Sequence, residues 1–319
     1  MVCCKESKEN SSFLDNMPKI FVIILNWNRA QDTIACLKSV GQLRVVGYEL
    51  NIIVVDNAST DDSVKAVRKL HVPGLWIIEN KKNLGFAEGN NVGIRYALEK
   101  GADYILVLNN DTLVEKNLVG ELLKAAKKSN NFGAASPKIY FAKGFEFHKK
   151  RYSASELGKV IWYAGGDIDW ENLYGTAHGV DEVDKGQFEK EGKTDFATGT
   201  CMFLKASALK KVGFFDKNYF MYLEDTDLSV RLKKKGFEVL FVPKAILWHK
   251  VAQSSGIGSS LNDYFITRNR LVFGMRYASL RTKIALIKES VKLLVSGRTW
   301  QRFGVRDFYL RKLGKGSWK

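Results

Sequence analysis

Short apolar runs alternate with helix-like stretches over the first third of the chain. The runs are rich in Ile and Val and are bounded by polar residues, which is typical of strands buried on both faces of a parallel sheet. We expect four such strands, at 19–25, 50–55, 75–78 and 104–108. Apolar residues recur at helical spacing between consecutive runs. This alternation predicts a doubly wound α/β sheet.

The pattern changes in the second half of the chain. Residues 141–194 hold many charged, Gly and aromatic residues without strong periodicity, so we expect long loops with short strands there. Strands are predicted again at 196–204 and 237–242, and the helix between them is expected to end at Lys235, before a glycine. Beyond residue 258 only basic, helix-like segments remain.

Polar clusters follow all four strands of the predicted sheet. They lie at 26–28, 56–57, 83 and 109–111. Any one of them could be a set of turn-forming residues, but ligands bind beyond the carboxyl ends of parallel strands, where all four meet. No GxGxxG or P-loop motif follows a strand, which disfavours a classical dinucleotide or P-loop site. These four clusters would form an amide-rich rim at the carboxyl ends of the strands, which suits ribose hydroxyls, a nucleobase edge and a metal-chelated diphosphate.

The composition narrows the class of protein. Apolar residues make up 45% and aromatic residues 12%, so the bulk of the chain is expected to fold around a core. No apolar run reaches the length of about 18 residues that a membrane-spanning helix needs, and the polar leader 1–17 does not look like a signal peptide. Four cysteines show no pairing or metal spacing. We therefore expect a cytoplasmic protein.

The formal charge of +16 is concentrated near the C-terminus. Residues 261–319 contain 14 Lys and Arg against 3 Asp and Glu, a net charge of +11, which leaves +5 for the rest of the chain. A basic segment of this kind points to an anionic partner, either nucleic acid or an acidic membrane surface.

The basic segment also contains an amphipathic pattern at 281–296. Ile284, Ile287, Val291 and Leu294 fall on one side of the predicted helix, and its basic residues fall mostly on other faces. Aromatic residues mixed with Arg follow. We expect this extension to lie on an anionic membrane surface, at the inner face of the cell membrane. The alternative is that its apolar side packs on the α/β body or on a second copy of the chain, which would make a homodimer.

Several motifs in this order resemble glycosyltransferase family 2, in particular its rhamnosyltransferase-like branch, over residues 20–255. The motifs are Leu25-Asn26-Trp27-Asn28, Val55-Asp56-Asn57-Ala58-Ser59-Thr60-Asp61, Asn83-Leu84-Gly85-Phe86-Ala87, Leu108-Asn109-Asn110-Asp111-Thr112, Gly199-Thr200, Gly213-Phe214-Phe215-Asp216, Glu224-Asp225 and Trp248-His249. The resemblance implies a GT-A fold, which is a Rossmann-like α/β fold with a mostly parallel central sheet and flanking helices.

The resemblance also implies the domain organisation. The glycosyltransferase domain would span 18–257, with a nucleotide-binding half at 18–112 and an acceptor-binding half at 113–257, and a basic helical extension would follow at 258–319. In the nucleotide-binding half, the resemblance makes a set of residues contacts of the nucleotide-sugar donor: Leu25, Asn26, Asn28, Asp56, Asn57, Asn83, Asn110 and Asp111. Asp56 and Asn57 suit uracil or thymine.

A divalent cation, Mn²⁺ or Mg²⁺, is implied as the cofactor. The Asp-x-Asp-type motif of the family is replaced here by Asn109-Asn110-Asp111, so only Asp111 is ionised and would be the metal ligand. The alternative is that Asp111 caps a helix. In several family members a His at the position of His249 completes the metal shell, although a lone His is more often a packed structural residue.

Inverting transfer in this family needs a general base, which is the Asp of a Glu-Asp pair. Asp225 would be that base, with Glu224 as the second candidate. The pair could also be only the acidic first turn of a helix. Thr198, Gly199 and Thr200 would line the acceptor side.

The expected function is therefore transfer of a sugar from a UDP- or dTDP-linked donor to a glycan or lipid-linked acceptor. Two other classes of protein fit the sequence less well. A nucleotidyltransferase would carry a Gly-rich basic loop after the first strand, which this chain lacks. A nucleic-acid-binding protein would fit the basic charge, but the excess lies outside the α/β body and no RNA-binding motif is visible, so no nucleic-acid partner is expected.

Overall fold

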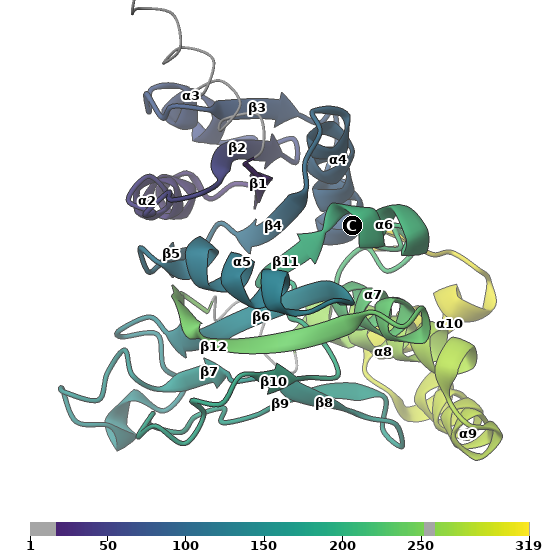
Figure 1. Ribbon diagram of the computed structural model, residues 1–319. Helices are drawn as coiled ribbons and strands as arrows, with labels where there is room; N and C mark the ends of the chain where they lie inside the picture. The colour runs from purple at the N-terminus through teal and green to yellow at the C-terminus, as the bar shows by residue number, and fades with distance from the viewer. Residues whose placement is uncertain (1–16, 252–258, 319) are drawn as a thin grey trace, which may run out of the picture.

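A ten-stranded sheet forms the centre of the computed structural model, which describes residues 17–251 and 259–318. Eight of its strands lie in the order β10-β12-β6-β11-β4-β1-β2-β3, while β5 pairs with β12 and β7 pairs with β6 (Figure 1). The four strands that the apolar runs predict form one half of the sheet and run parallel. They are β1 (Lys19–Asn26), β2 (Glu49–Asp56), β3 (Leu75–Glu79) and β4 (Tyr104–Asn109).

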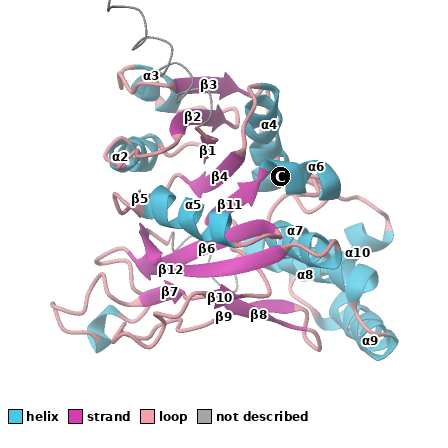
Figure 2. Cartoon of the chain, viewed as in Figure 1, coloured by secondary structure: helices cyan, strands magenta, loops and turns pink. Residues whose placement is uncertain are grey.

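Helices cover both faces of this half (Figure 2). Ile20, Val22 and Ile24 of β1 belong to one apolar layer, and Phe21 and Ile23 belong to the other, because side chains alternate along a strand. The first layer includes α2 (Ala30–Val40) and α5 (Leu118–Lys128), and the second includes α4 (Gly85–Glu99), α6 (Ala206–Val212) and α7 (Glu224–Lys234). The short α3 (Ser63–Arg68) packs beside α2. The predicted α/β class with a mostly parallel central sheet is confirmed.

The other half of the sheet is mixed. Strand β11 (Cys201–Lys205) runs antiparallel between β4 and β6 (Phe132–Phe141), and β12 (Glu238–His249) runs parallel to β6. Residues 141–194 contain only short elements, as expected. These are the helical turn η1 (Lys149–Arg151) and strands β7 (Ile161–Tyr163), β8 (Gly166–Asp169), β9 (Tyr174–Ala177) and β10 (Gly192–Lys193).

Two strand boundaries differ from the predicted ones. The strand expected at 196–204 begins only at Cys201, because side chains take up the backbone N–H groups before it: Ala197 donates to Ser229, Thr198 to Ser136 and Gly199 to Asp225. The strand expected at 237–242 continues to His249.

A proline explains why the sequence did not predict this continuation. Pro243 cannot donate a ladder hydrogen bond, so it reads as the end of a strand. The structure accommodates it with a register shift between Val242 and Ile246, after which the pairing with β6 resumes. The final residues of β12 also pair with the short strand β5 (Thr112–Val114).

Three helices form the predicted C-terminal extension: α8 (Ser260–Tyr277), α9 (Leu280–Ser296) and α10 (Thr299–Tyr309). Helix α10 packs along α8, and α9 contacts both. Three aromatic residues of the tail, Trp300, Phe303 and Trp318, cluster with Tyr264 and Phe265 of α8. These rings therefore pack within the protein.

Helix α9 lies at the outer end of this group (Figure 1). It packs through Leu286 and Ser290, which are its buried residues. The apolar side that the sequence predicts faces outward: Ile284, Ile287, Val291 and Leu294 are 48%, 40%, 54% and 40% exposed. The alternative that this side packs on the α/β body is therefore wrong. Within residues 17–251 and 259–318, no helix combines the length and the apolar character needed to cross a membrane.

Candidate active site

The register of the parallel strands brings the predicted rim residues together. Asn26 lies opposite Asp56 across β1 and β2, and Leu25 lies opposite Asn109 across β1 and β4. Asn26 Nδ2 donates to Asp56 Oδ1 at 2.8 Å. Asn110 Nδ2 donates to Asn26 Oδ1 at 3.3 Å, so side chains from three strand ends form one continuous network.

Asp56 is nearly buried at the centre of this network. Its Oδ1 accepts from Asn26 and from the hydroxyl of Ser59, and its Oδ2 accepts from the backbone N–H of Ser59 at 2.8 Å. A carboxylate oxygen has two lone pairs. Among these bonds only one ends on Oδ2, so Oδ2 retains acceptor capacity for a ligand.

The neighbouring amides hold the loops of the rim. Asn57 Nδ2 donates to Gly85 O at 3.0 Å and to Asn83 Oδ1 at 3.3 Å, and thus ties β2 to the start of α4. Asn28, in the left-handed region with φ 52°, accepts from the backbone N–H of Thr60 at 2.7 Å. These residues shape the rim mainly through bonds within the protein.

Asp111 and His249 come together through strand pairing. His249 lies opposite Thr112 in the pairing of β12 with β5, next to Asp111 in the chain. As a result, His249 Nε2 is 3.2 Å from Asp111 Oδ1. Because Asp111 precedes a strand, the alternative that it caps a helix is wrong.

This pair has unused bonding capacity. Asp111 Oδ1 and His249 Nδ1 are buried, and neither makes a hydrogen bond. Buried polar atoms are nearly always satisfied, and such exceptions often mark a site for an ion or ligand. Within the described part of the chain no group of three or more His, Cys, Asp and Glu side chains could hold a metal ion alone. The pair therefore fits a divalent ion that takes its other ligands from bound phosphates.

A pair of adjacent acidic residues begins α7. Leu223 precedes the helix in a left-handed conformation, and Glu224 and Asp225 are its first residues. Asp225 Oδ2 accepts from the backbone N–H of Gly199 at 2.8 Å, and Oδ1 accepts from the backbone N–H of Thr226 at 2.6 Å. Glu224 Oε2 is buried without a hydrogen bond.

Burial affects the two carboxyl groups differently. Loss of solvation, followed by the nearby charge of Asp225, raises the pKa of Glu224 well above its usual value. Burial also raises the pKa of Asp225, but the hydrogen bonds from Gly199 and Thr226 oppose this effect. Hydrogen bonds thus stabilise the ionised form of Asp225, which makes it the better proton acceptor of the two.

A cavity of about 760 Å³ joins the Asp111–His249 pair to the Glu224–Asp225 pair. Of the predicted site residues, it brings together Asp111, Thr198, Gly199, Thr200, Glu224, Asp225 and His249. The other predicted residues do not line it and belong to the adjoining rim: Leu25, Asn26, Asn28, Asp56, Asn57, Asn83 and Asn110.

Part of the cavity wall has no counterpart among the predicted residues. Phe147, His148 and Trp162 come from the irregular region 141–194, and Met221 and Asn262 come from the segment before α7 and from α8. Trp162 packs edge-on against His249, with 4.7 Å between ring centroids. The aromatic richness of the irregular region was the one available signal for the first three. The sequence alone assigns no role to His148.

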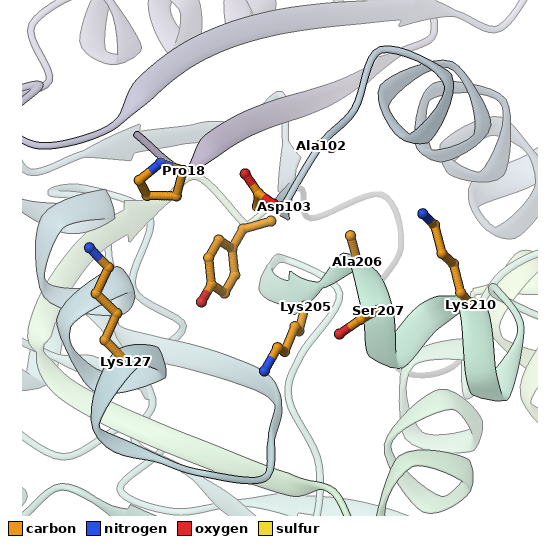
Figure 3. A pocket seen from close by; sticks show the side chains of 9 residues that line it. Pro18, Ala102, Asp103, Lys127, Lys205, Ala206, Ser207 and Lys210 are labelled. Atoms are coloured by element: carbon orange, nitrogen blue, oxygen red, sulfur yellow. The ribbon is translucent and has the colours of Figure 1, made fainter. Parts of the chain in front are cut away.

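A second cavity of about 460 Å³ lies at the opposite end of the parallel strands, where β1 and β4 begin (Figure 3). Its wall includes Lys127, Lys205 and Lys210, around the starting residues of β1 and β4. Asp103 provides its single carboxylate, which already accepts from the backbone N–H of Lys19. This cavity lies away from the carboxyl ends of the parallel strands, so it is not the candidate active site.

The sequence profile of glycosyl transferase family 2 matches residues 21–213, which is more than half of the chain. An N-acetylglucosaminyl-diphospho-decaprenol L-rhamnosyltransferase of Mycobacterium tuberculosis is 28% identical to this chain over 215 residues. The matching region covers 65% of this chain and 68% of that protein.

Solved structures share the fold. GalNAc-T7, determined with UDP, GalNAc and Mn²⁺, matches with a TM-score of 0.60 and 15% identity, over 87% of this chain and 58% of its own. A mannosyltransferase from Pyrobaculum calidifontis, in complex with GDP-Man and Mn²⁺, matches with a TM-score of 0.54 and 15% identity. That match covers 95% of this chain and 88% of the mannosyltransferase chain.

Proposed function

Because the chain belongs to glycosyltransferase family 2, we propose that it transfers a sugar from a UDP- or dTDP-linked donor to a glycan or lipid-linked acceptor, with inversion at the anomeric carbon. One observation carries this proposal: a single cavity holds the Asp111–His249 pair together with the buried Glu224–Asp225 pair. The two solved neighbours, which contain UDP or GDP-Man with Mn²⁺, support a nucleotide donor and a divalent ion.

The donor's nucleoside is proposed to bind on the rim of residues 18–112. Asp56 Oδ2 has acceptor capacity left, and the imide N–H of uracil or thymine is a donor of the right kind. Backbone groups of Leu25 and Asn26 would flank the base. The remaining rim amides, Asn28, Asn57, Asn83 and Asn110, would contact ribose or sugar hydroxyls or support those that do.

Asp111 and His249 are the proposed ligands of the divalent ion. When bound, such an ion stabilises the negative charge that develops on the departing diphosphate. A nitrogen ligand beside an oxygen ligand inclines the site towards Mn²⁺ over Mg²⁺. Since only one carboxylate is present, the phosphates of the donor would supply much of the affinity.

Asp225 is the proposed general base. It would take the proton from the acceptor hydroxyl while that oxygen bonds to the anomeric carbon and the bond from this carbon to the diphosphate oxygen breaks. Its hydrogen bonds from Gly199 and Thr226 stabilise its ionised form at the cavity wall. Glu224, whose pKa is raised by burial and by the charge of Asp225, would donate a hydrogen bond rather than accept one.

The acceptor would enter along the wall that residues 113–257 provide. Thr198, Gly199 and Thr200 lie next to Asp225, while Phe147 and Trp162 give the cavity an apolar side. An apolar wall suits a glycan whose ring faces stack or an acceptor attached to a lipid. The name of the mycobacterial relative, which specifies a decaprenol-linked acceptor, supports the lipid-linked class.

The exposed side of α9 is proposed to lie on an anionic membrane surface. Its apolar stripe, defined as Leu280, Ile284, Ile287, Val291, Leu294 and Val295, is exposed throughout. Lys288 and Lys292, which are also exposed, flank this stripe. Each basic residue near an acidic membrane contributes about 1 kcal/mol. Docking here would hold the enzyme at the cytoplasmic leaflet, beside a lipid-linked acceptor.

A donor screen tests the proposed function directly. Purified protein would be incubated with Mn²⁺ and UDP-, dTDP- or GDP-linked sugars, and release of the nucleoside diphosphate would be measured with and without EDTA. Turnover of a uridine or thymidine donor that EDTA abolishes supports the proposal. If no nucleotide sugar is turned over or bound, the assignment of donor class is wrong.

A further inference from the structure

Two buried polar side chains of α8 lie behind the wall of the catalytic cavity. Arg268 and Asn269 have no exposed surface. Burying a guanidinium or an amide is costly unless its hydrogen bonds are satisfied. The partners that satisfy these two groups therefore indicate what they do.

Most of these partners are backbone carbonyls of one short segment, residues 218–222. Asn269 Nδ2 lies 2.7 Å from the carbonyl oxygen of Met221, 2.9 Å from that of Tyr222 and 3.0 Å from that of Tyr219. Arg268 donates to Tyr219 O at 2.9 Å. It also donates to Asn269 Oδ1 through Nε at 3.1 Å and Nη2 at 3.0 Å, which fixes the orientation of the amide.

The segment that these groups hold has an unfavourable backbone. Phe220, Tyr222 and Leu223 have φ of 66°, 69° and 69°. Each non-glycine residue in the left-handed region costs about 1–2 kcal/mol, and such conformations persist only where the surroundings enforce them. The bonds from Asn269 to both sides of Phe220 and to Tyr222 supply part of that constraint.

This segment leads directly into the candidate base. Met221, Tyr222 and Leu223 line the catalytic cavity, and α7 starts immediately after them with Glu224 and Asp225. On its other side, the segment is tied to α4, because Phe220 O accepts from the backbone N–H of Ala87 at 3.0 Å. The segment is therefore held between α4 and α8.

We infer that Asn269 is a positioning residue for the transfer reaction, which holds the backbone of residues 219–222 and thereby sets the place of the Asp225 carboxylate in the cavity. Arg268 orients Asn269 for this task. The inference rests on the proposed function. It makes the C-terminal helices part of the catalytic unit, in addition to any role in membrane contact.

The variant Asn269→Asp tests this inference. Aspartate keeps the shape and the contact with Arg268, but an ionised carboxylate cannot donate to carbonyl oxygens. We expect kcat to fall at least about tenfold, while the KM for the donor stays within about twofold, because small misplacement of a reacting group is costly to the chemical step. Amide hydrogen exchange of residues 219–223 should become about tenfold faster.

The pH profile provides a readout that general destabilisation would not move. Burial raises the pKa of Asp225, and a loosened segment would admit water to this carboxyl group. The acid limb of kcat should therefore shift to lower pH in Asn269→Leu, which removes the amide donor and adds no charge near Asp225. The control is Val40→Ala, which creates a cavity at a buried position near the end of α2. It should lower the free energy of unfolding without changing kcat or the acid limb.

Two results would overturn the inference: wild-type kcat and exchange rates in Asn269→Asp, or losses of kcat that follow the loss of stability equally in both variants. If Asn269→Asp does not fold, hydrogen exchange of the wild type tests the inference instead. The backbone amides of Phe220 and Met221 should then exchange as slowly as those in the core of α8. Exchange of these amides within seconds would contradict the inference that Asn269 holds the segment. Because hydrogen exchange needs no substrate, failure of the donor screen alone would reject the proposed function and leave the inference about Asn269 and the segment untouched.

Discussion

The Asp225 carboxylate accepts a hydrogen bond from the backbone N–H of Gly199 across 2.8 Å. This contact joins the first turn of α7 to the end of the loop before β11. A hydrogen bond to the ionised form lowers a carboxyl pKa and opposes the effect of burial. The backbone at Gly199 thus both aims the proposed base and keeps it ready to accept a proton.

Gly199 is predicted to tolerate no larger residue. A Cβ atom there would lie 3.0 Å from Cζ of Phe86 and 3.4 Å from Oδ2 of Asp225. In Gly199→Ala, Phe86 must give way by a few tenths of an ångström and the new methyl group would touch Asp225 Oδ2, so kcat should fall about tenfold. The matched control is Gly120→Ala, which has nothing within 4 Å of its Cβ position. Equal kcat values in the two variants would show that close approach at Gly199 is not needed.

Asp111→Asn is predicted to weaken binding of the divalent ion. The substitution keeps the shape of the side chain and removes the single charge of the pair with His249. Donor turnover should fall about 100-fold or more, and Mn²⁺ binding followed by electron paramagnetic resonance should weaken. Asp103→Asn, at the other edge of the sheet, is the control. Full turnover by the wild type in EDTA would reject the metal role.

Glu224→Gln is predicted to change how stability depends on pH. The folded protein holds the Glu224 proton at pH values where the unfolded chain, with a pKa near 4.5, has released it. Between the unfolded and the raised folded pKa, the free energy of unfolding of the wild type should therefore fall by about 1.4 kcal/mol per pH unit relative to the variant. Urea unfolding of both proteins from pH 5 to 7 measures this gap. Parallel curves would mean that Glu224 ionises normally.

The double variant Ile284→Asn, Val291→Asn is predicted to lose binding to anionic vesicles. Both side chains are exposed on α9, so the free energy of unfolding should change by only about 0.5 kcal/mol for each. Co-sedimentation with phosphatidylserine-containing vesicles at about 0.1 M salt measures binding. Val46→Asn, an exposed apolar residue elsewhere, is the control.

Two outcomes would contradict membrane docking through α9. The first is a wild-type protein that does not bind these vesicles. The second is a wild-type protein that forms a dimer while the double variant is monomeric, because a second copy of the chain would then cover the apolar stripe. Truncation after Ser260 would not be a suitable test of membrane docking. It would remove α8, whose Asn269 holds the segment before Glu224.

Sequence periodicity was sufficient for the strands whose side chains are large and apolar. β1, β2 and β4 consist largely of Ile, Val and Leu, so their burial is visible in the sequence. Strand β6 is equally buried but contains Gly133, Ala134, Ala135 and Pro137, because helices pack closely against it. Small residues carry no strand signal, and β6 could not be predicted in this way.

The candidate site was predictable where a motif ends a strand and unpredictable where tertiary contacts build it. Asp111 lies two residues beyond the end of β4, and the Glu224–Asp225 pair opens a helix. The role inferred for Asn269 depends on its burial against a segment almost 50 residues away in the chain. A polar residue in a helix normally indicates a solvated face, so nothing in the sequence distinguishes it.

The most direct test of the account compares sugar transfer by the wild type, Asp225→Asn and Glu224→Gln under saturating donor and acceptor. Asparagine preserves the shape of Asp225 but cannot accept the proton. We expect kcat of Asp225→Asn to fall about 100-fold or more with the donor KM within about twofold, and that of Glu224→Gln to fall less. Wild-type kcat in Asp225→Asn together with a large loss in Glu224→Gln would contradict the assignment of Asp225 as the base.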